Sequence, residues 1–188
     1  AVAVLRANFP HAPIRHADVR DVDFSEFRGR VCVVAGGVPC QPFSLGGRGH
    51  GAADERNLFD EAVRCVREVL PNAFLFENVA GLMRSRFRSY IQSVLVRLRE
   101  LGYDANVHEA NAADYGCAQT RRRCFVVGTR RTAREFSPPA PTVARHQTVR
   151  EALAEVANDD ADSRRRVAMR CACYKNHAPR GLDTPSKT

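Results

Sequence analysis

The sequence predicts an α/β fold, in which helices pack against a sheet of strands. One observation is that short apolar runs, rich in β-branched residues, recur along the chain and read as buried strands. The other is that two longer segments between them carry apolar residues at helical spacing. Alternating strands and helices gather the connecting loops at one edge of the sheet, where ligands of open α/β sheets bind. The expected strands are residues 31–35, 73–76, 103–107 and 124–129, and the expected helices are residues 54–70 and 87–101.

The first 30 residues predict only short elements. Residues 2–8 read as the end of a helix, and residues 16–19 read as a short strand whose end carries an acid, Asp18. A helical turn is expected at residues 23–27, just before the apolar run 31–35.

Cys40 follows the end of the strand at 31–35, which Gly36-Gly37 stops. Pro39 and Pro42 restrict the backbone on either side, so that Cys40 cannot simply join a neighbouring strand. A free cysteine beside a turn is commonly buried and inert, and this is the alternative to a displayed thiol.

Polar residues follow two further strands of the expected sheet. The strand 73–76 delivers Glu77 at its end, and the loop 119–123, which contains Arg123, precedes the last strand. Cys40, Glu77 and Arg123 can therefore reach the same edge. The apolar stripes of both helices are interpreted as core.

A Pro-rich stretch, residues 137–147, is the best candidate for a domain boundary. It separates a first domain, residues 1–136, from residues 148–188. The second part opens on Thr148-Val149-Arg150-Glu151, which has the form of a capping box and predicts a short helix through Val156.

The formal net charge is +8 and the isoelectric point is about 9.5, which favours a polyanionic partner. Only Lys175 and Lys187 are lysines among 29 Lys and Arg residues. Arginine suits bidentate contacts to phosphate and guanine, although GC-rich coding sequence explains the bias equally well.

Seven cysteines are scattered without a regular framework, and their number is odd. We therefore expect free thiols in a reducing compartment, the cytoplasm. The sequence contains neither an apolar run of membrane-spanning length nor a secretory signal. Cys171, Cys173 and His177 offer only three candidate zinc ligands, so no metal site is expected.

Residues 36–44, Gly-Gly-Val-Pro-Cys-Gln-Pro-Phe-Ser, resemble the nucleophile motif of the DNA (cytosine-5) methyltransferases. Glu77-Asn78-Val79 and Gln119-Thr120-Arg121-Arg122-Arg123 are similar to two further motifs of that family, in the same order, and residues 111–116 resemble the segment that leads into the last one. The resemblance covers roughly residues 8–130. Ala118 stands where the family usually has proline, which loosens the turn but removes no reacting group.

The resemblance implies a Rossmann-like S-adenosylmethionine-dependent methyltransferase sheet with flanking helices. On this interpretation residues 1–136 are the catalytic domain, 137–147 the linker, and 148–188 the start of a smaller target-recognition region. The expected activity is methyl transfer to C5 of a cytosine flipped out of double-stranded DNA. A sequence-specific, restriction-modification role and a monomeric protein are also expected.

The resemblance also assigns roles to residues of this chain. The Cys40 thiolate adds to C6 of the ring, Glu77 serves N3 if burial keeps it protonated, and Arg123 serves O2. Arg121 supports Glu77 or grips phosphate. The alternative for Glu77 is an exposed acid in an ion pair.

Two further groups of residues are expected to bind cofactor and DNA. Asp18 resembles the acid that accepts a hydrogen bond from the adenine amino group, unless it is only a turn or cap residue. The expected cofactor contacts are Asp18, Val19, Pro39 and Leu58, and the expected DNA contacts are Gln41, Ser44, Arg48 and Gln119. Residues 45–51 are basic and rich in glycine, and predict either a lid over DNA or a plain surface loop.

We expect the chain to be a piece of a longer protein. It has no initiator Met, and the family's opening Phe-x-Gly-x-Gly loop and the acid that follows it for the ribose hydroxyls are both missing. This piece alone is therefore expected to bind cofactor poorly and not to methylate. Three other functions remain open: a non-catalytic DNA-binding module, a cysteine hydrolase and a tRNA cytosine-5 methyltransferase. The hydrolase would need a histidine to activate Cys40, and His50 and His108 fall in no such pattern.

Overall fold

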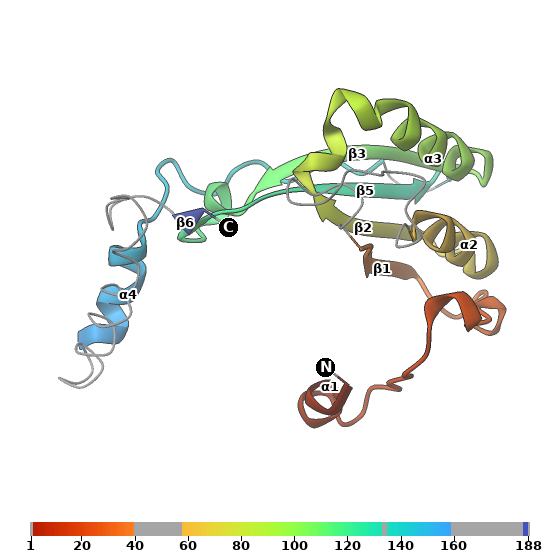
Figure 1. Cartoon of the computed structure of the whole chain (residues 1–188), viewed down its shortest axis with the longest axis horizontal. Helices are drawn as coiled ribbons and strands as arrows, with labels where there is room; N and C mark the ends of the chain where they lie inside the picture. Colours follow the sequence, from red (N-terminus) through yellow and green to blue (C-terminus); the bar gives the residue numbers. More distant parts are fainter. Residues whose placement is uncertain (1, 40–57, 133–134, 159–185, 188) are drawn as a thin grey trace.

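The computed structural model describes residues 2–39, 58–132, 135–158 and 186–187, and its centre is a four-stranded sheet (Figure 1). The strands lie in the order β1-β2-β5-β3. β1 pairs in parallel with β2, and β5 is antiparallel to both of its neighbours. The strands are β1 (Val33–Gly37), β2 (Ala73–Val79), β3 (Tyr103–Asn111) and β5 (Arg122–Arg130).

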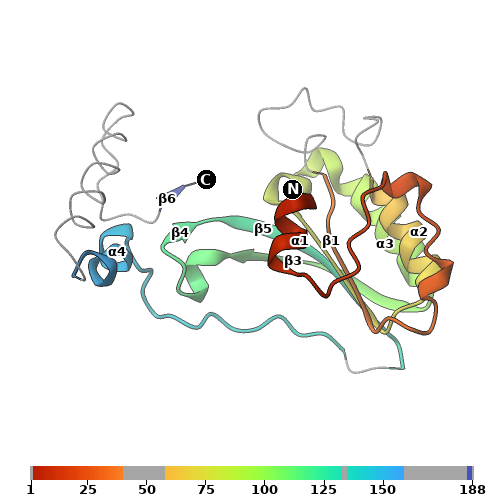
Figure 2. The same ribbon diagram turned by 90° about the horizontal axis from the view of Figure 1, so that it is seen from below.

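Two helices, α2 (Phe59–Val69) and α3 (Arg88–Glu100), lie side by side and pack on the sheet (Figures 1 and 2). α2 belongs to the crossover between the parallel strands β1 and β2, as a βαβ unit requires. The apolar stripes of both helices are buried, which confirms that they are core. The main members of this core are Phe59, Val63, Val66, Ile91, Val94, Leu95 and Leu98 from the helices and Phe74, Phe76, Tyr103 and Val126 from the sheet.

Burial alternates along β2, and this alternation determines which side chains pack and which remain available. Phe74, Phe76 and Asn78 are buried, whereas Leu75, Glu77 and Val79 are half-buried. Successive side chains of a strand point to opposite faces. Glu77 therefore lies on the face opposite to the aromatic core.

The predicted strands are confirmed, with shifted ends. β1 begins and ends two residues later than expected, and β2 and β3 continue three and four residues further. The segment 119–123 was expected to be a loop, and this is wrong in part. Gln119–Thr120 form a short strand β4, and β5 begins at Arg122 because the pairing with β3 extends to Asn111.

The strand expected at residues 16–19 is not formed. Asp18 instead caps a 3-10 helix η1 (Val19–Asp21), because its carboxylate accepts a hydrogen bond from the backbone N–H of Arg20 at 3.0 Å. Such a local bond competes with strand pairing. The expected helix and helical turn on either side are present, as α1 (Val2–Asn8) and η2 (Ser25–Phe27).

The remaining described elements are short, apart from α4 (Val149–Asn158). Three 3-10 helices lie beside the sheet: η5 (Ala80–Met83), η6 (Ser85–Phe87) and η7 (Ala112–Tyr115). β4 pairs in parallel with β6 (Ser186–Lys187). Figure 1 places α4 away from the central sheet, beyond the ends of β3 and β5 where η7 lies.

The predicted capping box of α4 is confirmed. The Glu151 backbone N–H donates to Thr148 Oγ1 at 3.2 Å, and Glu151 Oε2 accepts from the Thr148 backbone N–H at 2.7 Å. A hydrogen bond from Arg145, with those from Thr148, lowers the pKa of Glu151 to about 2. The stretch before it contacts η7, since Tyr115 donates to the Pro139 carbonyl at 2.9 Å. The domain boundary at 137–147 stays a prediction.

Candidate active site

The C-terminal ends of β1 and β2 form the edge of the sheet where the site residues were expected. The two strands are in register, with Gly37 opposite Glu77. The described chain leaves β1 through Val38 and Pro39, so Cys40 follows three positions after Gly37. Cys40 itself lies outside the described residues, as do Gln41, Ser44 and Arg48.

Glu77 and Arg123 meet directly at this edge. Arg123 Nε lies 2.8 Å from Glu77 Oε1, and Arg121 Nη2 lies 3.8 Å from the same oxygen. Antiparallel pairing of β2 with β5 sets Val79 opposite Arg123 and so brings the two motifs together. The structure thus assembles three of the four residues for which the sequence predicted catalytic roles.

The expected burial of Glu77 is not observed. Its side chain is 36% exposed, and that of Arg123 is 19% exposed. The reason is the alternation of β2, which buries Asn78 instead. Glu77 is half-buried and lies near two guanidinium groups, so the ion pair of the alternative is formed although the acid is not fully exposed.

Asn78 is a site residue whose position the sequence did not reveal. It is fully buried, its Nδ2 donates to the Val38 carbonyl at 3.2 Å, and its Oδ1 accepts from the Val79 backbone N–H at 2.9 Å. It therefore ties the chain just before Pro39 to the end of β2. The available signal was an amide in phase with Phe74 and Phe76 on the buried face of a strand.

A cavity of about 240 Å³ opens beside the ion pair. Its lining combines charged side chains with apolar and aromatic ones. It is lined by Glu77, Arg121, Arg123, Ala110, Ala112, Tyr115 and Phe125.

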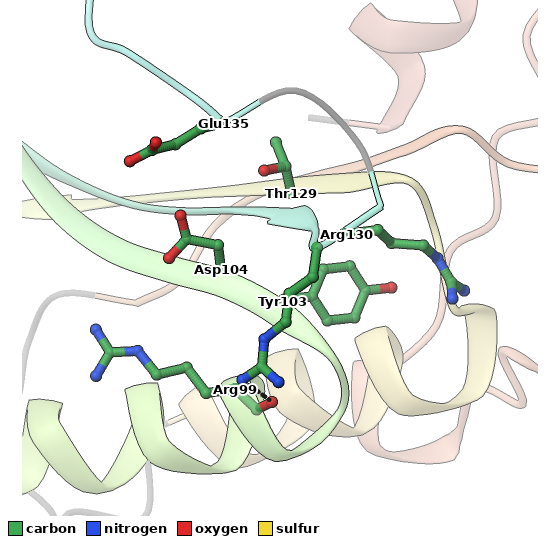
Figure 3. A pocket seen from close by; sticks show the side chains of 7 residues that line it. Arg99, Tyr103, Asp104, Thr129, Arg130 and Glu135 are labelled. Atoms are coloured by element: carbon green, nitrogen blue, oxygen red, sulfur yellow. Dashed lines mark hydrogen bonds between the residues drawn. The ribbon is translucent and has the colours of Figure 1, made fainter.

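A larger cavity, about 370 Å³, lies at the other end of β3 and β5 (Figure 3). Its guanidinium groups are already engaged with the backbone. Arg99 Nη2 donates to the Ala105 carbonyl at 2.7 Å, and Arg130 Nε donates to the Pro71 carbonyl at 3.1 Å. No predicted site residue lines this cavity, so we do not assign the site to it.

The predicted cofactor residues do not share either cavity. The Asp18 carboxylate is paired with Arg20, with Nη2 at 2.7 Å from Oδ2, and the hydrogen bonds from Arg20 lower the pKa of Asp18 to about 2. The Val19 carbonyl accepts a hydrogen bond from Arg64, and Leu58 packs against the core just before α2. Gln119, predicted to contact DNA, lies half-buried in β4.

The comparisons with known proteins decide the family. Over residues 1–184 the sequence matches the model of the C-5 cytosine-specific DNA methylases. The chain belongs to this family. This confirms the resemblance carried by the motifs at residues 36–44, 77–79 and 119–123.

Two relatives of this C-5 methylase chain are type II methyltransferases. The chain is 35% identical to M.NgoMIV of Neisseria gonorrhoeae over 161 residues, which cover 85% of this chain and 51% of the relative. It is 40% identical to M.NaeI of Lentzea aerocolonigenes over 164 residues, which cover 85% of this chain and 39% of that protein. The chain thus spans about half, or less, of the length of these relatives.

Solved structures confirm the Rossmann-like fold of the C-5 methylase chain. A prophage-encoded DNA modification methyltransferase of E. coli is 27% identical with a TM-score of 0.67, over 81% of this chain and 44% of that one. DNMT2 of Spodoptera frugiperda is 19% identical with a TM-score of 0.59, over 80% and 48% of the two chains, and shows the fold alone.

The described cysteines of the methylase chain differ in exposure. Burial raises the pKa of Cys124 to about 12 and that of Cys65 to about 11. Cys124 also donates a hydrogen bond from Sγ to the Val79 carbonyl at 3.2 Å. Cys32 and Cys117 are exposed. The thiols of Cys65, which is half-buried, and Cys124, which is buried, are therefore protonated at neutral pH and unsuited to nucleophilic attack.

Neither a metal-binding cluster nor a membrane-spanning helix is found among the residues that the structure describes. The described part of the chain holds no group of three or more metal-binding side chains, and Cys171, Cys173 and His177 lie outside it. Within the described ranges no helix is long and apolar enough to cross a membrane.

Proposed function

We propose that the whole protein is a DNA (cytosine-5) methyltransferase that uses S-adenosylmethionine and acts on a cytosine flipped out of duplex DNA. The observation that carries the proposal is the Glu77–Arg123 pair, whose Oε1 and Nε atoms lie 2.8 Å apart. Glu77 lies opposite Gly37 at the end of β1, and Cys40 follows three residues later in the sequence. This arrangement occurs in a chain of the C-5 methylase family. A nucleophile, an acid and a cation are the groups that the reaction needs.

Cys40 provides the nucleophile in this proposal. C5 of cytosine is a weak nucleophile, and thiolate addition to C6 moves ring electrons toward C5. Sulfur suits the step because it attacks readily and also leaves readily. S-adenosylmethionine, when bound, supplies an electrophilic methyl group. Removal of the C5 proton by a base and loss of the Cys40 thiolate then restore the ring.

Glu77 and Arg123 stabilise the ring while Cys40 is attached. The base enters the cavity beside the ion pair, where Glu77 acts in its protonated form. The protonated acid then donates a hydrogen bond to N3. Arg123, released from the ion pair, donates to O2, where negative charge accumulates.

The residues proposed for the cofactor fit an adenine group. The Asp18 carboxylate is exposed and accepts three hydrogen bonds from Arg20, two at Oδ1 and one at Oδ2. A carboxylate has about four lone-pair positions, so one remains on Oδ2 for an amino group. Val19, Pro39 and Leu58 are half-buried apolar side chains that can contact the ring.

A covalent trap tests the proposal. The full-length protein is mixed with S-adenosylmethionine and a mixed-sequence duplex that contains 5-fluorocytosine, and the products are separated on a denaturing gel. Fluorine at C5 prevents the final elimination, so the protein is expected to stay attached to DNA. Cys40→Ser should abolish the adduct, and Cys32→Ser, which changes an exposed cysteine, should leave it unchanged.

Binding of DNA without an adduct on any sequence offered would favour the non-catalytic DNA-binding module.

The sequence specificity is measured by a second experiment, bisulfite sequencing of genomic DNA from cells that express the protein. Because the relatives are named type II methyltransferases, we propose a restriction-modification role. This role predicts that methylated cytosines occur within one short DNA sequence.

A further inference from the structure

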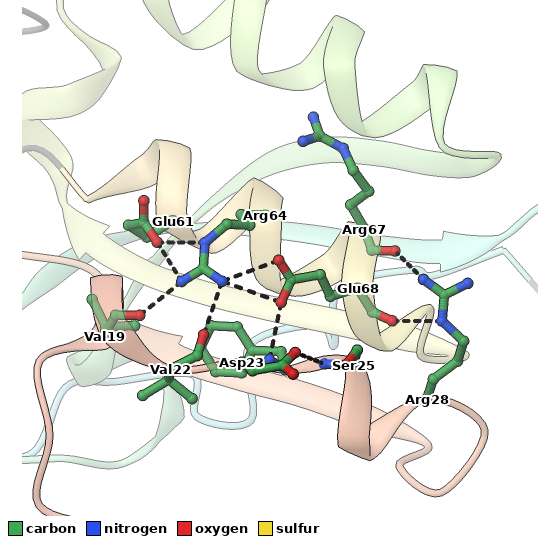
Figure 4. Close-up of polar contacts among 10 residues, drawn as sticks. Val19, Val22, Asp23, Ser25, Arg28, Glu61, Arg64, Arg67 and Glu68 are labelled. Atoms are coloured by element: carbon green, nitrogen blue, oxygen red, sulfur yellow. Dashed lines mark hydrogen bonds and ion pairs between the residues drawn. The ribbon is translucent and has the colours of Figure 1, made fainter.

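The segment of residues 18–28 is joined to the rest of the molecule largely by polar contacts. Neither of its two 3-10 helices, η1 and η2, contains a buried residue. It nevertheless runs along α2, and the contacts converge on one side chain of that helix, Arg64 (Figure 4). The segment includes Asp18 and Val19, the residues proposed to hold the adenine group.

Arg64 binds both ends of η1 at once. Its Nη2 donates to the Val19 carbonyl at 2.8 Å, and its Nη1 donates to the Val22 carbonyl at 2.9 Å. Val19 is the first residue of η1, and Val22 is its C-cap. One guanidinium therefore fixes the position of a whole turn whose N-cap is Asp18.

Two acids of α2 hold the guanidinium in place. Arg64 Nε donates to Glu61 Oε2 at 2.7 Å, and Nη1 donates to Glu68 Oε1 at 3.0 Å. The Arg64 side chain is only 25% exposed, and its guanidinium lies 5.0 Å from the centre of the Phe24 ring. Arginine presents five donors in a rigid planar fork, which a lysine ammonium cannot reproduce.

Glu68 extends the same network to η2. Its Oε2 accepts from the Phe24 backbone N–H at 2.9 Å, and its backbone carbonyl accepts from Arg28 Nε at 2.9 Å. The network thus links α2 to both 3-10 helices of the segment, from Val19 to Arg28. α2 in turn is anchored by its buried apolar face.

We propose that Arg64 is a positioning residue for cofactor binding, because it holds Asp18 and Val19 beside the start of α2, where Leu58 lies. The inference rests on the proposed function, since it takes these residues as the adenine site. Arg64 itself does not touch the cofactor. It removes the entropy cost of ordering the segment at each binding event.

Kinetics of the full-length protein test the proposal through Arg64→Met. We expect KM for S-adenosylmethionine to rise roughly tenfold, while kcat at saturating cofactor stays within about twofold, because a contact to the adenine group binds the ground state and the transition state equally. Arg64→Lys should resemble Arg64→Met, since one ammonium cannot bind both carbonyls. A matched control is Arg67→Met, which alters an exposed arginine of the same helix whose side chain points away from the network (Figure 4).

A second, milder variant guards against loss of folding. Glu68→Gln keeps the side-chain shape and should shift KM for the cofactor in the same direction by a smaller factor. Hydrogen exchange provides an independent readout, because the Val22 amide donates to the Val19 carbonyl at 3.3 Å and should exchange faster in Arg64→Met than in Arg67→Met.

The outcomes separate this proposal from the proposed function. Equal KM values for Arg64→Met and Arg67→Met would overturn the positioning role alone, as would an equal fall of kcat and kcat/KM. A wild-type protein that neither binds S-adenosylmethionine nor forms the fluorocytosine adduct would overturn both proposals together.

Discussion

At the residue scale, Glu77 shows how one strand serves packing and chemistry with alternate side chains. Asn78 is fully buried and ties β2 to Val38, whereas Glu77 faces the other side and is 36% exposed. Glu77 contributes little to the core, so its ion pair with Arg123 is available for function. A side chain that is more than one third exposed gains little stability from such a pair.

This position leads to a prediction for Glu77→Gln in the full-length protein. The rate of methyl transfer should fall by about 10²- to 10⁴-fold, the range expected when a general acid is removed. The free energy of unfolding should change by less than about 1 kcal/mol. Both quantities are measurable, by transfer of labelled methyl groups to DNA and by urea unfolding.

Glu109→Gln is the matched control for this prediction. Glu109 is 35% exposed and pairs with Arg122 at 2.6 Å on the neighbouring strand, but it does not line the cavity beside Glu77. It should leave the rate nearly unchanged. A similar fall in rate for both variants would mean that the loss of any carboxylate in this sheet lowers the rate, and that Glu77 has no specific role in the site.

At the scale of elements, the close contact between β5 and β2 depends on a glycine. A Cβ added at Gly128 would lie 2.3 Å from Phe74 Cζ. The Phe74 ring is fully buried, and its centre lies 5.3 Å from that of Phe76 and 5.2 Å from that of Tyr103. The ring therefore has no free space into which it could move.

Gly128→Ala should consequently lower the free energy of unfolding by about 1–3 kcal/mol, the usual cost of overpacking a core. Gly36→Ala is the comparison, because its new Cβ would meet the nearest Phe76 ring atom at an ordinary 3.6 Å. Urea unfolding of the full-length protein would give both values. A Gly128→Ala protein as stable as Gly36→Ala would show that β2 and β5 can separate at low cost.

The elements that the sequence predicted well are those with a repeating apolar pattern. α2 and α3 carry apolar residues at helical spacing, and the box at Thr148 and Glu151 is a purely local signal. The segment at Asp18 was mispredicted, because a single capping hydrogen bond outweighed a weak strand preference. The strand ends were also missed, since pairing with a neighbour, and not the strand's own sequence, sets how far it extends.

The sequence predicted that Glu77, Arg121 and Arg123 would lie together, but not the exposure of Glu77. The motifs named Glu77, Arg121 and Arg123, and the antiparallel register of β2 and β5 brought them together. Nothing in the sequence revealed that Glu77 would be half-exposed. Arg64 was also missed, because an arginine on a helix that is polar on one face gives no sign that it binds a distant segment.

At the scale of the whole molecule, part of the net charge of +8 is concentrated in the segment that follows β2. The connection from β2 to α3 carries the exposed Arg84 and Arg86, and the exposed Arg88 is the first residue of α3. Within the described ranges none of them forms an ion pair, and the first turn of α3 contains no acid. Positive charge at the start of a helix is locally unfavourable, so an anionic partner would relieve it.

We therefore predict that these arginines contact DNA phosphates in the full-length protein. Replacing Arg84, Arg86 and Arg88 together by Gln should weaken binding to duplexes of any sequence. The negative slope of log K against log salt should become shallower by up to about 3, because each phosphate that is no longer neutralised accounts for about 0.9. The control replaces Arg97, Arg122 and Arg145, which pair with Asp60, Glu109 and Glu151 and carry the same total charge. Titrations at several salt concentrations would measure both slopes. If both triple variants lowered the slope equally, binding would depend on total charge, whereas a decrease confined to the first would place the DNA backbone along the turn between β2 and α3.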